Sequence, residues 1–265
     1  MKNVILSLIL IIFLMGCTAN QQSASTQDGR AVFAITDAAA DMKTVTSVKV
    51  TVDSVKIHSE TDGWIDVTNT KQEYDLLKLK AEDKQALLAD AQLKEGNYNQ
   101  LRLDISKVIV TDSTGDHEAK LPSGELKING ELTVKANTTS TATFDFILDE
   151  SLHMTGNGKY ILAPVIQLET REDAEVNVND DNKVEIKSGK VKTNVKVGMD
   201  VKGDVGIGLG ISKDEIIDID AVGGLKLGLG GNKEKSNEAK AESQTSVNVD
   251  DKLEIDSSLE TGVTA

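Results

Sequence analysis

The sequence predicts a mainly β protein: an antiparallel β-sandwich with one short helix and a strand-rich C-terminal extension. Two observations lead to this prediction. The apolar residues are mostly Val, Ile, Leu and Ala, with only four Phe, three Tyr and one Trp in 265 residues, and β-branched side chains pack well on a pleated surface. Several segments also alternate apolar and polar residues with a period of two, as half-buried strands do, and turn residues separate them.

Residues 1–17, MKNVILSLILIIFLMGC, have the composition of a secretory signal peptide. The apolar run from Val4 to Met15 is too short to cross a bilayer as a helix, because crossing takes about 20 residues. Leu14-Met15-Gly16-Cys17 resembles the lipobox of bacterial and archaeal lipoproteins, in which the cysteine is diacylglyceryl-modified and becomes the mature amino terminus. The resemblance implies lipidation of Cys17. The alternative is a plain signal peptide with an incidental cysteine.

Cys17 is the only cysteine of the chain, so an intrachain disulfide and a Cys-based zinc site are both excluded. A diacylglyceryl group supplies two acyl chains, and two chains are enough for stable anchoring, at about 0.8 kcal/mol per buried CH₂. Residues 18–30, TANQQSASTQDGR, are polar and aperiodic, which favours a flexible tether. We therefore expect an extracytoplasmic protein held by its lipid at an outer membrane, in a periplasm or on an archaeal surface.

Residues 31–172 contain the segments of the predicted sandwich. The predicted strands are 31–36, 45–57, 64–67, 98–110, 141–148 and 160–169. Turns are predicted at 60–63, 113–116, 122–124 and 129–130, where Gly, Pro, Asn, Asp and Ser are concentrated. The first turn makes a hairpin of 45–57 and 64–67. The helix is predicted at 81–92, AEDKQALLADAQ, because its acidic residues come early and Gly96 follows it.

Several motifs in this region occur together and in order. They are Thr36-Asp37-Ala38, Val55-Lys-Ile-His58, Gly63-Trp64, Gly96-Asn-Tyr98-Asn-Gln-Leu101-Arg102-Leu103, Leu121-Pro-Ser-Gly124, Phe144-Asp-Phe146, Ser151-Leu-His153-Met-Thr-Gly156-Asn157-Gly158-Lys-Tyr160 and Pro164-Val-Ile166. The set resembles the domain-of-unknown-function family 4382 over about residues 31–170. The resemblance implies a sandwich like those of transthyretin and carboxypeptidase-regulatory domains, in secreted or lipid-anchored prokaryotic proteins. It implies no catalytic residue.

The matched residues also have structural interpretations of their own. Tyr98 follows Gly96 closely, and its hydroxyl is expected to bond back to the backbone as in a tyrosine corner. Gly156-Asn157-Gly158 suits a tight turn with positive φ. Trp64 is interpreted as a core anchor, with a sugar-stacking platform as the alternative.

Charge and motif content exclude several function classes. The formal net charge is −14, and no basic stripe interrupts it, so nucleic acid is not expected as a partner. There is no Gly-x-Ser-x-Gly elbow. His58, His117 and His153 are far apart in the sequence, and the oxygen-rich stretches 112–118 and 177–182 do not match a calcium-binding helix–loop–helix. We expect no catalytic residue, no cofactor and no metal, with bound calcium as the alternative to solvated turns.

Residues 173–265 form the predicted extension, which is acidic and rich in Gly, Val and Lys. Apolar and polar residues alternate from Val191 to Ile211, which predicts hairpins that bend near Gly198 or Gly203-Asp204. Three interpretations stay open. The extension is a small accessory sheet packed on the sandwich, a partly disordered tail that includes 232–244, or a module that adds strands or self-assembles.

The predicted function is that of a lipid-anchored, non-catalytic binding or scaffold protein. Its expected partners are the membrane, through the anchor, and an extracellular protein or glycan. One alternative is an adhesive or self-assembling surface component that uses the C-terminal strands. The other is a secreted enzyme with an unrecognised site.

Overall fold

The computed structural model describes residues 27–38, 42, 44–212, 216–219 and 225–228. Cys17, most of the tether and the polar segment 232–244 lie outside the described residues.

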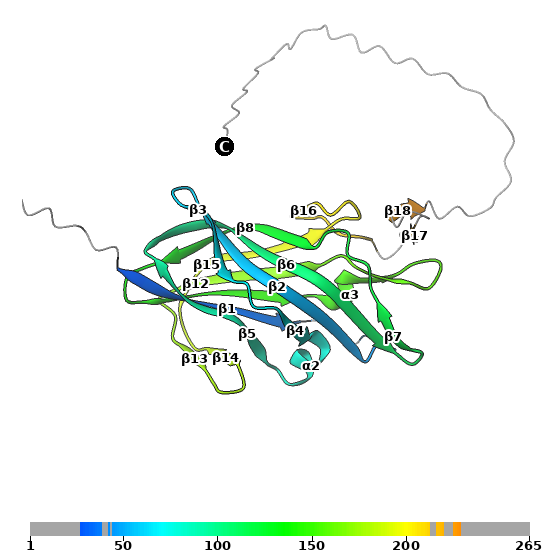
Figure 1. Ribbon diagram of the computed structural model, residues 1–265, viewed down its shortest axis with the longest axis horizontal. Helices are drawn as coiled ribbons and strands as arrows, with labels where there is room; N and C mark the ends of the chain where they lie inside the picture. The colour runs from blue at the N-terminus through cyan, green and yellow to red at the C-terminus, as the bar shows by residue number, and fades with distance from the viewer. Residues whose placement is uncertain (1–26, 39–41, 43, 213–215, 220–224, 229–265) are drawn as a thin grey trace, which may run out of the picture. The chain divides into compact units, whose positions relative to one another are not determined.

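The larger of two main sheets has eight strands in the order β13–β14–β5–β1–β9–β12–β15–β16 (Figure 1). These strands are β1 (Asp28–Asp37), β5 (Gln85–Lys94), β9 (Thr139–Phe146), β12 (Val165–Glu172), β13 (Val176–Val178), β14 (Lys183–Ile186), β15 (Lys190–Met199) and β16 (Val205–Gly206). β1 and β9 run parallel, whereas the other pairings of this sheet are antiparallel. The C-terminal ends of β1 and β9 therefore meet at the same edge of the sheet.

The second main sheet has six strands. Its order is β3–β2–β6–β7, with β4 also paired to β2 and β8 to β6. The strands are β2 (Ser47–Ser59), β3 (Gly63–Thr68), β4 (Gln72–Asp75), β6 (Gly96–Asp112), β7 (Gly115–Glu118) and β8 (Glu125–Val134). Two further antiparallel pairs are β10 (Leu152–Met154) with β11 (Tyr160–Leu162), and β17 (Ile216–Ile219) with β18 (Leu225–Gly228).

The main apolar core is one cluster to which both sheets contribute. Its fully buried side chains include Phe33, Phe144 and Phe146 of the eight-stranded sheet and Ile57, Leu101 and Leu103 of the six-stranded sheet. Alternation places the polar residues of the same strands on the outer faces. The mainly β sandwich is thus confirmed, with the parallel β1–β9 pair as the exception to its antiparallel pairing.

Several local predictions are confirmed. β2 and β3 form the predicted hairpin, in which Ser59 pairs with Gly63. β6 and β7 turn at 113–114, with Asp112 opposite Gly115. The Tyr98 hydroxyl donates a 2.9 Å hydrogen bond to the carbonyl of Lys94, as a tyrosine corner requires.

The helix predicted at 81–92 is wrong, because most of that segment is β5. The helix lies earlier, as α2 (Leu76–Ala81), where the Asp75 side chain caps it by accepting from the backbone N–H of Lys78. A second helix, α3, covers Leu148–Ser151. Within the described part, no helix combines the length and apolar character that crossing a membrane requires.

The turn predicted at Asn129-Gly130 is also wrong, because β8 continues through both residues. The pairing of β8 with β6 shifts register here, so the pair marks a bulge. A Cβ at Gly130 would lie 2.8 Å from Cδ2 of Leu168 in the other sheet. Glycine is therefore needed for close approach of the two sheets.

The start of the predicted C-terminal extension belongs to the eight-stranded sheet. β13 and β14 extend the sheet beyond β5, and β15 and β16 extend it beyond β12. The bend predicted near Gly203-Asp204 is confirmed between β15 and β16. Gly203 has a φ of +90°, and Oδ1 of Asp200 accepts the backbone N–H groups of Lys202 and Asp204 at 2.9 and 3.0 Å.

Candidate functional site

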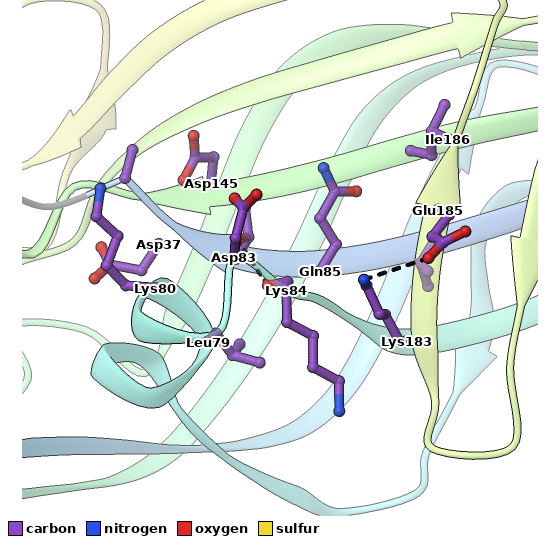
Figure 2. Close-up of a pocket in the computed structure, with 13 residues that line it drawn as sticks. Asp37, Leu79, Lys80, Asp83, Lys84, Gln85, Asp145, Lys183, Glu185 and Ile186 are labelled. Atoms are coloured by element: carbon purple, nitrogen blue, oxygen red, sulfur yellow. Dashed lines mark hydrogen bonds and ion pairs between the residues drawn. The ribbon is translucent and has the colours of Figure 1, made fainter.

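A polar pocket of about 540 Å³ lies at the C-terminal ends of β1 and β9 (Figure 2). The turn between α2 and β5 and the strand β14 supply its other walls. Its charged and amide lining includes Asp37, Lys80, Asp83, Gln85, Asp145 and Glu185. The pocket is large enough for a small molecule.

Pairing between distant strands builds this pocket. The parallel register puts Thr36 of β1 beside Asp145 of β9. The Thr36 hydroxyl donates a 3.0 Å hydrogen bond to the carbonyl of Lys84, which ties the α2–β5 turn to β1. β14 is placed by its pairing with β5 and by Val184, which belongs to a small apolar cluster with Val32 and Ala34 on β1.

Two buried acceptor atoms on the pocket wall lack hydrogen-bond donors among the described residues: Oδ1 of Asp145 and Oε1 of Gln85. A buried acceptor without a donor is destabilising, and a bound donor relieves that cost. Burial raises the pKa of Asp145, although the charge of Lys80 and the backbone N–H of Ala38 act in the opposite direction. The wall therefore suits a ligand that donates hydrogen bonds, a positively charged one above all.

Charged side chains at β14 flank the pocket. Lys183 and Glu185 form a 3.3 Å ion pair there, and Lys84 donates to the backbone carbonyl of Asp181 at 3.2 Å. The ion pair lies within β14, whereas the bond from Lys84 helps to hold the β13–β14 hairpin against the α2–β5 turn. The pocket wall thus depends on a strand pair from the C-terminal part of the chain.

The three histidines do not form a common site. His58 pairs with Gln100 and His117 with Val110, so ten residues of β6 separate their positions. Ten residues of strand span about 33 Å. His153 lies on β10. Among the residues that the structure describes, no group of three or more His, Cys, Asp and Glu side chains is arranged to hold a metal ion.

Asp112, in the first oxygen-rich stretch, stabilises the β6–β7 hairpin. Its Oδ1 accepts from the backbone N–H and the hydroxyl of Thr114 at 2.7 and 2.6 Å, and Oδ2 accepts from the Tyr160 hydroxyl at 2.8 Å. The bonds from Thr114, then that from Tyr160, hold the pKa of Asp112 well below its ordinary value. Burial and the bond to this carboxylate raise the pKa of Tyr160 to about 12.

The contact between His117 and Asp112 is not a catalytic relay. Nε2 of His117 contacts both the Thr114 hydroxyl, at 2.8 Å, and Oδ1 of Asp112, at 3.1 Å. A relay would need different ring nitrogens for the hydroxyl and the carboxylate. These contacts are suited to stabilising the β6–β7 hairpin rather than to activating the Thr114 hydroxyl as a nucleophile.

The interpretation of Trp64 as a core anchor is wrong. The residue is 38% exposed and its side chain lies on the outer face of β3, whereas Ile65 packs against the core. The Arg102 guanidinium lies over the indole at 4.2 Å from its centroid, and the His58 ring meets it edge-on at 5.1 Å.

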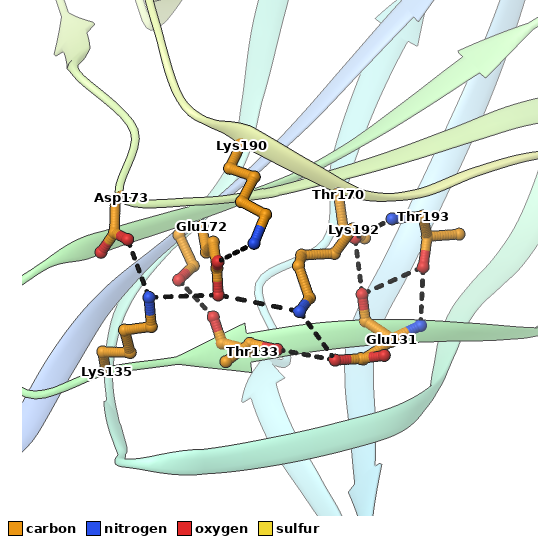
Figure 3. Close-up of polar contacts among 10 residues, drawn as sticks. Glu131, Thr133, Lys135, Thr170, Glu172, Asp173, Lys190, Lys192 and Thr193 are labelled. Atoms are coloured by element: carbon orange, nitrogen blue, oxygen red, sulfur yellow. Dashed lines mark hydrogen bonds and ion pairs between the residues drawn. The ribbon is translucent and has the colours of Figure 1, made fainter.

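A cluster of charges lies around Glu172 at the end of β12 (Figure 3). The Glu172 carboxylate lies 3.3 Å from Nζ of Lys135, 3.5 Å from that of Lys190 and 3.9 Å from that of Lys192. Burial alone would raise the pKa of Glu172, but the hydrogen bond from Lys135 and the three lysine charges outweigh it and lower the pKa. Lys135 directly follows β8 of the six-stranded sheet, and Lys190 and Lys192 lie on β15 of the eight-stranded sheet. The cluster therefore links the two sheets.

Comparison with known families identifies the fold unit. A family model described as a domain of unknown function, DUF4382, matches residues 28–164. No curated protein and no solved structure matches the chain. The match contains β1, α2, β5 and β9 of the pocket but not β14. Since it covers more than half of the chain, the protein belongs to the DUF4382 family.

Proposed function

We propose that the protein is a lipid-anchored, extracytoplasmic, non-catalytic binding protein that takes a small hydrogen-bond-donating ligand in the pocket of Figure 2. The observation that carries this proposal is the pair of buried acceptors, Asp145 Oδ1 and Gln85 Oε1, on the wall of that pocket. The signal-like amino terminus with its lipobox cysteine, Cys17, supports the anchor.

The ligand class follows from the chemistry of the wall. Four acids and three lysines line the pocket beside Gln85, so its charge is slightly negative: the acids are Asp37, Asp83, Asp145 and Glu185, and the lysines are Lys80, Lys84 and Lys183. A primary ammonium group carries three donors and a positive charge, and a hydrogen bond to an ionised carboxylate is roughly twice as strong as a neutral one. Small amines are therefore the favoured ligands, and polyols, with neutral donors, the weaker ones.

Asp145→Asn is expected to weaken amine binding by roughly tenfold, because it keeps the side-chain shape but removes the charge. Binding of ethanolamine, putrescine and glycerol to the full chain in detergent is measured by calorimetry, with thermal shift as a second readout. In the wild type, amine binding should fall as acidification protonates Asp145. Because its pKa is raised, that loss begins at a higher pH than for an ordinary aspartate of pKa 3.8.

Asp180→Asn is the matched control, since this exposed aspartate lies in the β13–β14 turn and does not line the pocket. It should bind like the wild type. Amine binding that is equal in the Asp145 and Asp180 variants, or undetectable in all three proteins, would contradict the proposed ligand site.

Cys17→Ser is expected to abolish incorporation of a labelled fatty acid, because the hydroxyl does not replace the thiol that forms the thioether bond to the diacylglyceryl group in the lipobox reaction. The label is followed in cells that express the full chain, and protease added outside the cytoplasmic membrane reports exposure of the folded part. Cys17→Ala controls for the hydroxyl. Undiminished label in either variant would rule out lipidation at this residue.

A further inference from the structure

Trp64 belongs to a polar surface on the outer face of the six-stranded sheet, which we call the Trp64 platform. It consists of Trp64, His58, Gln100, Arg102, Lys127 and Asn129. We propose that this platform binds an acidic glycan whose sugar ring stacks on the indole while its carboxylate pairs with Lys127. The proposal goes beyond the pocket, with which the platform shares no lining residue.

Strand register brings these side chains together. Trp64 pairs with His58, His58 with Gln100, and Gln100 with Asn129, so the four positions form one row across β3, β2, β6 and β8. The neighbouring row runs from Asp66 through Lys56 and Arg102 to Lys127. Residues two apart on a strand share a face, so both rows face away from the core.

The indole is held in place but remains accessible. Arg102 lies over the ring and is itself fixed by a 2.9 Å ion pair with Glu125, while Nδ1 of His58 is hydrogen-bonded to Asn99 at 2.9 Å. The exposure of 38% is what remains after these contacts. A preordered aromatic ring costs little entropy on binding, and its electron-rich face attracts the polarised C–H groups of a pyranose.

Two amides extend the platform next to the ring. Nε2 of Gln100 donates a 2.9 Å hydrogen bond to Oδ1 of Asn129. That bond leaves the Gln100 carbonyl oxygen as an acceptor and the Asn129 amino group as a donor. A sugar hydroxyl both donates and accepts, so a donor and an acceptor side by side match it.

The charge of the platform selects an acidic sugar. Although the chain carries a net charge of −14, the second row places three cations, Lys56, Arg102 and Lys127, after a single acid, Asp66. Lys56 is paired with Asp66 and Asp104, and Arg102 is paired with Glu125. Lys127 forms no ion pair with a described residue. The ammonium group of Lys127 is therefore available to form an ion pair with a uronate carboxylate.

Tetragalacturonate and neutral cellotetraose are titrated separately into the full chain in detergent. Trp64 is the only tryptophan, so the intrinsic emission of the protein reports on the platform directly. We expect tetragalacturonate to change this emission saturably, with an apparent affinity that falls as salt screens the carboxylate. Cellotetraose is expected to bind at least about threefold more weakly, since it lacks the ion pair.

Calorimetry on variants completes the test. Trp64→Ala should weaken tetragalacturonate binding by roughly tenfold and Lys127→Gln by about threefold. Two control substitutions should leave tetragalacturonate binding unchanged. Lys107→Gln replaces an exposed lysine on β6 outside the platform, and Asp145→Asn changes the pocket. Equal binding of both oligosaccharides would overturn the acidic specificity. Absence of binding, or binding that Trp64→Ala does not weaken, would overturn the platform, and neither result bears on the amine pocket.

Discussion

Phe144→Ala is expected to lower the free energy of unfolding by about 3–5 kcal/mol, the largest stability loss anticipated for a single residue of this chain. Phe144 is fully buried and lies on β9, which is flanked by β1 on one side and β12 on the other. Truncation leaves a cavity in the core between the two sheets, where neighbours on both flanking strands restrict collapse. Chemical denaturation of the full chain in detergent, followed by far-ultraviolet circular dichroism, measures the loss.

Two control variants separate cavity formation from the loss of an aromatic ring. Phe144→Leu keeps most of the volume and should cost under about 1.5 kcal/mol. Trp64→Ala removes a larger ring from the outer face of the other sheet and should cost about 1 kcal/mol or less. If Trp64→Ala proved as destabilising as Phe144→Ala, the exposed position of the indole would be contradicted.

The contrast between these two aromatics shows where sequence reasoning succeeds and fails. The long alternating segments of β2 and β6 were predictable, because period-two patterning is local and one face of each strand is buried. Trp64 also lies in an alternating strand, but alternation alone does not say which of two neighbouring residues faces the core. Here Ile65 takes the core side, and the large ring is left on the outer face.

Segment 85–94 shows tertiary structure overriding local propensity. Its Ala, Leu, Gln and Lys residues favour a helix, yet β1 on one side and β14 on the other pair with it. Buried Ala86, Leu88 and Leu93 join the core. The true helix had a local signal, the Asp75 cap directly before Leu76, which could have been identified from the sequence.

The pocket was beyond sequence reasoning for a different reason. It depends on the parallel register of β1 with β9 and on β14, more than 140 residues after β1 begins. Two motifs of the sequence, Thr36-Asp37-Ala38 and Phe144-Asp-Phe146, contribute residues to the pocket, but neither motif indicates a pocket by itself. The platform is similar, because Trp64, Gln100 and Asn129 become neighbours only through strand pairing. His58, Gln100 and Arg102 also belong to motifs of the sequence, but their closeness to Trp64 could not be predicted from it.

The proposed amine pocket and the proposed glycan platform lie on different sheets. The pocket lines the ends of β1 and β9 in the eight-stranded sheet, and the platform lies on β3, β2, β6 and β8 in the other. One contact that joins the two sheets is made by Thr170, whose hydroxyl bonds to Glu131 on β8.

Thr170→Val is expected to lower the free energy of unfolding by about 1–3 kcal/mol, because one buried hydroxyl makes two hydrogen bonds at the junction of the sheets. The Thr170 hydroxyl donates to the backbone carbonyl of Glu131 on β8 at 2.5 Å and accepts the backbone N–H of Thr193 at 3.1 Å (Figure 3). The register of β12 with β15 shifts next to Thr170. At this bulge the Thr170 hydroxyl, in place of a backbone carbonyl, accepts the hydrogen bond from the Thr193 N–H. Valine keeps the shape but leaves the Thr193 N–H without this acceptor.

A double-mutant cycle tests whether Thr170 and Thr193 act as one unit. The Thr193 hydroxyl also donates to the Glu131 carbonyl, at 3.1 Å, so Thr170→Val and Thr193→Val should be non-additive by about 0.5 kcal/mol or more. Thr133→Val is the control, since it removes an exposed hydroxyl bonded to the Glu131 side chain at 3.0 Å and should cost about 0.5 kcal/mol or less. Additive losses, or a Thr170 variant as stable as the Thr133 control, would contradict the role of Thr170 and Thr193 as one unit that joins the sheets.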